Sequence, residues 1–166
     1  MSQGSLEKLF FEERLDWRLR SVLEVGRDVP GGWCLYQSSD VTILVLGSQV
    51  TEKSEVLDLA ATAYLRSLSL PRVAKCFDVA LTLWEEKQAS GKVWSIDTDG
   101  RFCGYFSHCL NYRILESGGV LGFDVLAGDY VDRGKGNFDV LAIVAEDMTG
   151  LKEILGLIYG GDWAHV

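Results

Sequence analysis

The stretch that decides the fold runs from Lys92 to Leu126 and reads KVWSIDTDGRFCGYFSHCLNYRILESGGVLGFDVL. Within it, short runs of β-branched and aromatic residues are separated by the turn sequences Thr98–Gly100 and Ser117–Gly119. Runs of this kind, bounded by Gly, Asp and Ser, are typical of strands that tight turns connect. The stretch therefore predicts an antiparallel meander.

The same pattern of short apolar runs and turn sequences continues to Ala145, with another turn at Arg133–Gly136. Farther upstream, two apolar runs joined by Ser38–Asp40 predict a separate hairpin. About six strands are expected, at Trp33–Gln37, Val41–Leu46, Val93–Asp97, Phe102–His108 or a little beyond, Val120–Leu126 and Phe138–Val144.

Apolar residues recur at helical spacing in about four other segments. A helix capped by Ser5 is predicted to run to about Val25, and a second helix, preceded by Thr51, is predicted to run to about Leu68. Pro71 suits the first turn of a third helix, and Asp147 or Thr149 starts a short closing helix. The third helix has the clearest apolar stripe, which predicts a core-facing side made of Val73, Cys76, Phe77, Ala80, Leu81 and Trp84.

Strands and helices that do not alternate regularly favour an α+β fold over a Rossmann-like one. We expect a largely antiparallel sheet of about six short strands, with about four helices packed mainly on one face. The chain has 166 residues, of which 48% are hydrophobic, and no proline-rich or serine-rich linker divides it. Residues 1–166 are therefore expected to form a single globular domain.

Acidic residues outnumber basic ones by 24 to 16, which gives a net charge of −8 at pH 7. That charge repels a phosphate backbone, so nucleic acid is not expected as a partner, whereas a basic protein is electrostatically favoured. No apolar run reaches the roughly 18 residues that a membrane-spanning helix needs. Most of the cysteines lie in apolar segments, as buried free thiols do in a reducing compartment. We expect a cytoplasmic protein without membrane contact.

The sharpest local motif is Gly-Asp-Tyr-Val-Asp-Arg-Gly at residues 128–134, directly after the apolar run Val120–Leu126. It resembles the GDYVDRG motif of the PPP-family protein serine/threonine phosphatases. In that family the motif follows a strand, its first Asp bridges two metal ions, and its Arg contacts the substrate phosphate. The resemblance implies these roles for Asp129 and Arg133, and two cations around a shared carboxylate suit phosphoester hydrolysis.

The rest of that family's pattern departs from this sequence. Asp97 and Asp99 precede the motif at a suggestive distance, but an aspartate stands where the family has a histidine. The family also needs two later histidines, and this chain contains only His108 and His165. The alternative function is a metal-dependent phosphoesterase built on Asp97, Asp99, Asp129, Asp132 and Arg133, with Asp97, Asp99 and Asp129 as the metal ligands. The leading function requires no cofactor or metal.

His108 and Cys109 stand side by side and raise the question of a cysteine nucleophile. On a strand, adjacent side chains point to opposite faces, and the sequence reveals no third group that would orient them. This pair is therefore not expected to be catalytic. Cys76, in the apolar stripe of the third helix, is expected to be a core residue.

Aromatic and acidic side chains gather in the glycine-flanked loop, where Tyr130 has Asp129 and Asp132 beside it and Asp124 nearby in sequence. Such a loop suits a cationic partner surface. Trp163, in the glycine-containing terminal segment, is expected to lie outside the regular core. The predicted binding residues are Asp129, Tyr130, Asp132, Arg133 and Trp163.

Since no complete set of catalytic residues is evident from the sequence, we expect a non-catalytic domain that binds a protein partner. It would act by occlusion, as inhibitor, immunity and anti-defence proteins do. A second alternative, besides the phosphoesterase, is a small-ligand or nucleotide sensor with an aromatic-lined pocket between helices and sheet.

Overall fold

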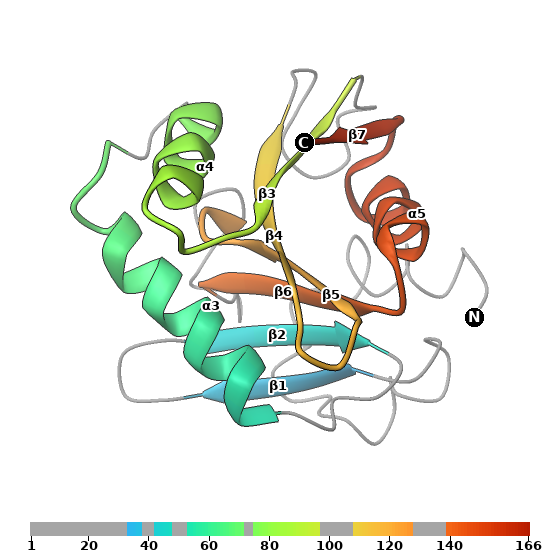
Figure 1. Cartoon of the computed structure of the whole chain (residues 1–166), viewed down its shortest axis with the longest axis horizontal. Helices are drawn as coiled ribbons and strands as arrows, with labels where there is room; N and C mark the ends of the chain where they lie inside the picture. Colours follow the sequence, from blue (N-terminus) through green and yellow to red (C-terminus); the bar gives the residue numbers. More distant parts are fainter. Residues whose placement is uncertain (1–32, 38–41, 48–52, 72–74, 97–107, 128–138) are drawn as a thin grey trace.

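The computed structural model describes residues 33–37, 42–47, 53–71, 75–96, 108–127 and 139–166 (Figure 1). Within these ranges, seven strands form one sheet in the order β1-β2-β6-β5-β4-β3-β7, and three helices pack on it. The strands are β1 Trp33–Gln37, β2 Thr42–Gly47, β3 Gly91–Ser95, β4 Cys109–Ile114, β5 Val120–Asp124, β6 Val140–Ala145 and β7 Trp163–His165. The helices are α3 Lys53–Ser67, α4 Cys76–Glu85 and α5 Met148–Tyr159.

Antiparallel pairing dominates the sheet, and the predicted α+β class is confirmed. The strands β6, β5, β4, β3 and β7 form one continuous antiparallel run. The β1–β2 hairpin joins this run through a parallel pairing of β2 with β6, in which Ile43 lies beside Val140. Two parallel strands require a crossover connection. Between β2 and β6 the chain forms α3, α4, β3, β4 and β5.

The terminal segment adds a strand that the sequence pattern did not predict. Trp163 begins β7, which pairs with the edge of β3, and its side chain is 7% exposed. The expectation that Trp163 lies outside the regular core is therefore wrong. The backbone of β3 needs hydrogen-bond partners on this edge, and the terminal segment provides them. The indole of Trp163 is buried at a low cost because it donates to the carbonyl of Gly160 at 3.0 Å.

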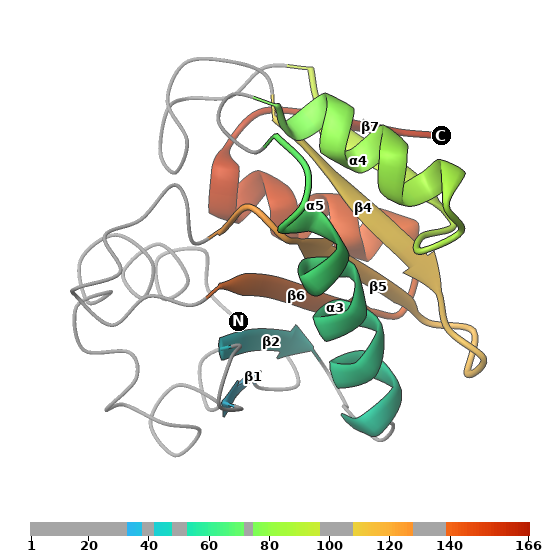
Figure 2. The same ribbon diagram turned by 90° about the vertical axis from the view of Figure 1, so that its left-hand side faces the viewer.

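The helices cover both faces of the sheet. Figure 2 shows α3 and α4 on one face and α5 behind it on the other. Every residue of β5 is buried, which requires cover on both sides. On the α5 side, Gly122 leaves room for Leu151, since a Cβ at Gly122 would lie only 2.5 Å from Leu151 Cδ1. The expectation of helices mainly on one face is thus corrected by α5.

Two elements begin later along the chain than the sequence predicts. α4 begins at Cys76, although Pro71 suits a helix start, because Lys75 still has the non-helical dihedral angles φ −124° and ψ 27°. Cys76 therefore takes the first helical position instead of the second turn of a longer helix. β4 begins at Cys109, beyond most of the predicted strand Phe102–His108, and residues 97–107 lie outside the described ranges.

Other boundaries follow the sequence more closely. Asp147 caps α5 as predicted, and its carboxylate accepts a hydrogen bond from the Gly150 N–H at 2.8 Å. The helix predicted over residues 5–25 lies outside the described residues. Among the helices that the structure describes, none has the length and apolar character needed to cross a membrane.

Candidate active site

Asp124 is a buried carboxylate at the end of β5, inside the otherwise apolar run VLGFDVL. An unpaired carboxylate is costly to bury, so hydrogen-bond donors are expected around it. His108 Nε2 lies 2.8 Å from Oδ2, and the main-chain N–H of Leu126 donates to Oδ1 at 3.0 Å. The hydroxyl of Tyr159 also donates to Oδ2. Both carboxylate oxygens are therefore held by donors from other parts of the fold.

His108 directly precedes β4 and is fully buried. Its main chain is tied to the end of β3, because its N–H donates to Ser95 Oγ and its carbonyl accepts from the Ser95 N–H, each at 2.8 Å. The ring of Tyr159 packs against the imidazole, with 4.9 Å between ring centroids. These contacts fix the ring with Nε2 on Asp124. Nδ1 is therefore the nitrogen that can exchange a proton with another group.

Cys76 interacts with the imidazole from another element. It occupies the first position of α4 and is 8% exposed. Its thiol interacts electrostatically with the side chain of His108 and with the main chain of Cys109. The start of α4 thus lies against the start of β4, and Cys76, His108 and Asp124 form a buried series of thiol, imidazole and carboxylate.

The electrostatics of this series favour a charged thiol. Burial alone would raise the pKa of the Cys76 thiol, but the hydrogen bond and the charge of His108 outweigh burial and lower it. Burial would lower the pKa of His108, yet the charge and hydrogen bond of Asp124 raise it to about 9. The pKa of Asp124 is lowered, because the charge and hydrogen bond of His108 overcome its burial. Together these interactions favour the thiolate–imidazolium form of the pair, backed by a carboxylate.

Cys109 has the opposite environment, although it adjoins His108 in sequence. It is 2% exposed, and its Sγ lies 3.9 Å from the carbonyl oxygen of Leu110. Burial, with a smaller contribution from the charge of Cys76, raises the pKa of the Cys109 thiol to about 12. Cys109 is thus a protonated, packed thiol, and His108 interacts with the cysteine of another element.

Asn111 fixes α4 in its place on the sheet. It is 2% exposed, and its Nδ2 donates to the carbonyl of Ala80 at 2.9 Å and to that of Gly91 at 3.1 Å. One side chain of β4 therefore joins the middle of α4 to the start of β3. Because α4 carries Cys76 and β4 follows His108, this contact sets the position of Cys76 relative to His108.

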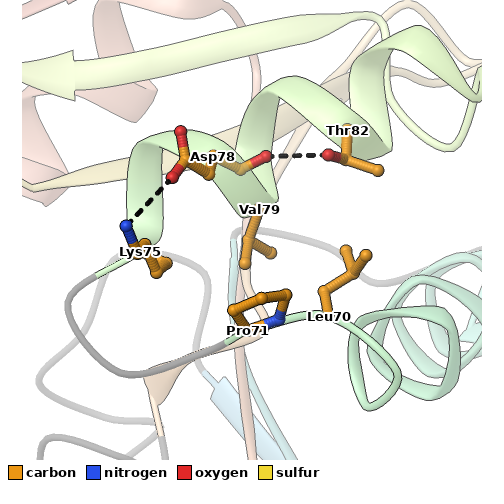
Figure 3. A pocket seen from close by; sticks show the side chains of 6 residues that line it. All are labelled: Leu70, Pro71, Lys75, Asp78, Val79 and Thr82. Atoms are coloured by element: carbon orange, nitrogen blue, oxygen red, sulfur yellow. Dashed lines mark hydrogen bonds and ion pairs between the residues drawn. The ribbon is translucent and has the colours of Figure 1, made fainter.

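A small pocket of about 180 Å³ flanks the start of α4 (Figure 3). It lies between the turn after α3 and the side of α4, and Cys76 is not one of its lining residues. Lys75 and Asp78 form an exposed ion pair at 3.7 Å on its rim, and Thr82 Oγ1 donates to the carbonyl of Asp78 at 2.9 Å. The lining residues are Leu70, Pro71, Lys75, Asp78, Val79 and Thr82.

Most of the site residues predicted from the sequence lie outside the described residues. Their roles in binding a partner, phosphate or metal stay predictions. Asp124, which the sequence grouped with the Tyr130 loop, is instead buried at the end of β5 against His108. Trp163 packs against Tyr159 with 5.4 Å between ring centroids. The predicted site residues outside the described ranges are Asp97, Asp99, Asp129, Tyr130, Asp132 and Arg133.

The sequence pattern did not identify Cys76, His108 and Asp124 as one site. Cys76 fits an apolar helix stripe, and it does pack within the hydrophobic core. The available signal was Asp124, since a carboxylate in the buried run VLGFDVL needs a partner, and the chain has only two histidines that could supply one. The helix start at Cys76 was hidden by Pro71, which fits a helix start several residues earlier.

Comparison with known proteins gives no match to a protein-family model, a curated sequence or a solved structure. In the part of the chain that the structure describes, no group of three or more His, Cys, Asp or Glu side chains could hold a metal ion. The function is therefore inferred from the geometry and charge of the side chains themselves.

Proposed function

We propose that the protein is an acyl-transfer enzyme with Cys76 as nucleophile, His108 as acid and base, and Asp124 as the residue that orients His108. The observation that carries the proposal is that the imidazole of His108 interacts with both the Cys76 thiol and the Asp124 carboxylate. A nucleophile, a base and an orienting carboxylate in this relation support covalent catalysis on unrelated folds. The expected substrates are esters, thioesters or amides, whose carbonyl carbon accepts a thiolate.

The reaction proceeds through a thioester. The Cys76 thiolate attacks the carbonyl carbon of the substrate and forms a carbon–sulfur bond. The imidazolium of His108 gives its proton to the leaving amine, alcohol or thiol as the carbon–nitrogen, carbon–oxygen or carbon–sulfur bond of the substrate breaks. Water then attacks the thioester and gives a proton to His108, and Cys76 leaves as a thiolate. Another nucleophile in place of water would give transfer instead of hydrolysis.

The start of α4 supports both charged states of this reaction. The first N–H groups of a helix have no acceptor within the helix and carry the positive end of its dipole. Because Cys76 is the first residue of α4, it belongs to the turn that carries these donors. They stabilise the thiolate before the attack and the oxyanion that forms next to the sulfur afterwards.

A test needs only a generic acyl donor, because the natural substrate is not required to detect the thioester. With an aryl acetate ester, we expect aryl alcohol release and an acetyl group on Cys76, located by peptide mass spectrometry. Cys76→Ser should lower the rate by at least about 10³-fold. Cys109→Ser is the matched control and should retain the activity, since Cys109 lies outside the proton-transfer series.

Two outcomes contradict the proposal. One is an acetyl group on Cys109 or on no cysteine at all. The other is a Cys76→Ser variant that releases the alcohol as fast as the wild-type protein. An unchanged circular dichroism spectrum of Cys76→Ser would show that the variant is folded, so that its rate can be compared directly with that of the wild-type protein.

Occlusion of a basic protein partner is a separate proposal, favoured by the net charge of −8. It does not need the thiol, so Cys76→Ser should bind the same partner as the wild-type protein. Affinity purification with both variants tests this, and recovery of a partner only with the reactive thiol would favour a substrate complex instead.

A further inference from the structure

We propose that Tyr159 is a positioning residue of this site, which sets how strongly Asp124 holds the imidazole of His108. The inference rests on the proposed function and deepens it. Tyr159 is the last residue of α5, on the face of the sheet opposite α4, the helix of Cys76. Its hydroxyl donates to Asp124 Oδ2, the same oxygen that lies 2.8 Å from His108 Nε2.

The ring of Tyr159 is held by packing on two sides as well as by its hydroxyl. It is fully buried, with its centroid 4.9 Å from that of His108 and 5.4 Å from that of Trp163. Trp163 is fixed in turn by its hydrogen bond to Gly160, the residue that follows Tyr159. A phenylalanine at this position would therefore keep the ring in place and remove only the hydroxyl.

Sharing one oxygen between two donors weakens each interaction. A hydroxyl that donates to a carboxylate oxygen draws negative charge from it, so Oδ2 attracts an imidazolium less than an unshared oxygen would. Without the hydroxyl, Asp124 keeps its orientation, because Leu126 still donates to Oδ1 and His108 to Oδ2. The expected consequence of losing the hydroxyl is a stronger pull of Asp124 on the proton of His108.

The charged and titratable groups around the imidazole come from each neighbouring element. Cys76 faces it from α4, Asp124 from β5 and Tyr159 from α5. Cys109 of β4 stays neutral, since its pKa is raised to about 12, and Lys92 of β3 acts on Cys109. The hydroxyl of Tyr159 is therefore an uncharged contact of Asp124. Its removal changes how strongly Asp124 attracts the imidazolium and leaves Cys76 unaltered.

The test is an NMR titration of His108 in the full-length Tyr159→Phe variant. The chain has two histidines, so a His165→Gln variant identifies the signal of His108. We expect the titration midpoint of His108 to rise by about half a unit to one unit when the hydroxyl is removed. The rate of acetylation of Cys76 should fall at high pH as His108 loses its proton, and the pH of this fall should move up by the same amount. An unchanged or lowered midpoint overturns the inference.

Two further proteins separate an electrostatic role from a purely structural one. Trp163→Phe changes the packing around Tyr159 but keeps its hydroxyl, so the midpoint of His108 should stay where it is. Wild-type protein made with fluorotyrosine has a more acidic hydroxyl, which donates more strongly and should move the midpoint down. A fluorotyrosine protein with an unchanged midpoint also overturns the inference, and it serves as the test if Tyr159→Phe fails to fold.

The inference and the proposed function fail in distinguishable ways. If Cys76 of the wild-type protein forms no acetyl thioester while the midpoint of His108 still shifts, the enzyme proposal fails and the link from Tyr159 to His108 stands. If the thioester forms and the midpoint does not respond to Tyr159, only the inference about Tyr159 fails.

Discussion

Cys76 and Cys109 are buried at the starts of neighbouring elements, Cys76 at the start of α4 and Cys109 at the start of β4. Both are less than a tenth exposed, and both are free thiols. The hydrogen bond and charge of His108 lower the pKa of Cys76, whereas burial raises that of Cys109 to about 12. Two thiols that are buried to a similar extent therefore have pKa values shifted in opposite directions, because only Cys76 interacts with the imidazolium of His108.

This difference shows that the pKa of each thiol is set by contacts between elements and not by neighbours in sequence. His108 adjoins Cys109 in the chain, but its imidazole serves Cys76 on α4 and is held by Asp124 on β5. Changes to the contacts of Cys76 should therefore alter the chemistry, while equal changes around Cys109 should alter stability at most.

Asp124→Asn should have the largest effect on the difference in reactivity between Cys76 and Cys109. An amide keeps the size of the carboxylate but lacks the charge that orients and stabilises the His108 imidazolium. We expect acetylation of Cys76 by an aryl ester to slow by about 10³- to 10⁴-fold. Asp147→Asn, at the exposed cap of α5, is the matched control and should leave the rate unchanged. An equal rate in Asp124→Asn and wild-type protein would contradict the role of the carboxylate.

Alkylation compares the two thiols within a single molecule. At neutral pH, iodoacetamide should modify Cys76 at least about 10²-fold faster than Cys109, because only the thiolate reacts. Peptide mass spectrometry after a short exposure gives both rates from one sample. Equal labelling of the two cysteines would show that His108 does not activate Cys76. Labelling after unfolding in urea is the control, since both thiols should then react alike.

Stability should depend on pH through His108, and the dependence is clearest in Cys76→Ala, which has no thiolate to oppose it. In this variant the charge and hydrogen bond of Asp124 still raise the pKa of His108 above the ordinary value of 6.5, although the contribution of Cys76 to the wild-type value of about 9 is lost. The contribution is therefore complete below pH 6.5 and is lost as pH rises through the raised pKa. We expect the free energy of unfolding in urea to fall by at most about 3 kcal/mol over this window. His108→Asn in the same background should abolish this slope, and a slope that persists would assign it to other groups.

A smaller effect is expected at Asn111, which joins α4 to the sheet. Asn111→Ala leaves the buried carbonyls of Ala80 and Gly91 without this donor, so stability should fall by about 1 to 3 kcal/mol. The acetylation rate of Cys76 should also fall, because α4 is no longer fixed against β4. Thr82→Ala removes an exposed hydroxyl of α4 and should change stability by less than about 0.5 kcal/mol. Equal effects of the two variants would show that Asn111 does not position the helix.

Much of the fold could be predicted from local sequence, but not the site. Alternating apolar residues and turn sequences identified the hairpin and most of the meander, and Asp147 marked the start of α5. These features depend on residues close together in the chain. The terminal strand at Trp163 was missed because a short edge strand is stabilised by pairing with β3 and has little pattern of its own.

The site was missed because it depends on contacts between distant segments. Cys76 satisfies the apolar stripe of α4, and only the observed helix start reveals that its thiol lies at the end of the helix. The interaction between His108 and Asp124 joins β4 to β5 and follows from strand pairing, not from a motif. A buried aspartate in an apolar strand was the one sequence feature that required a partner.

The pKa of the Cys76 thiol tests the central claim most directly. It can be measured from the ultraviolet absorbance of the thiolate, as the difference between titrations of the wild-type protein and Cys76→Ser. A midpoint below the ordinary thiol value of 9.0, which returns toward or above that value when His108→Asn is introduced, is the predicted result. A midpoint at or above 9.0 in the wild-type background would show that Cys76 is as inert as Cys109 and would contradict the account.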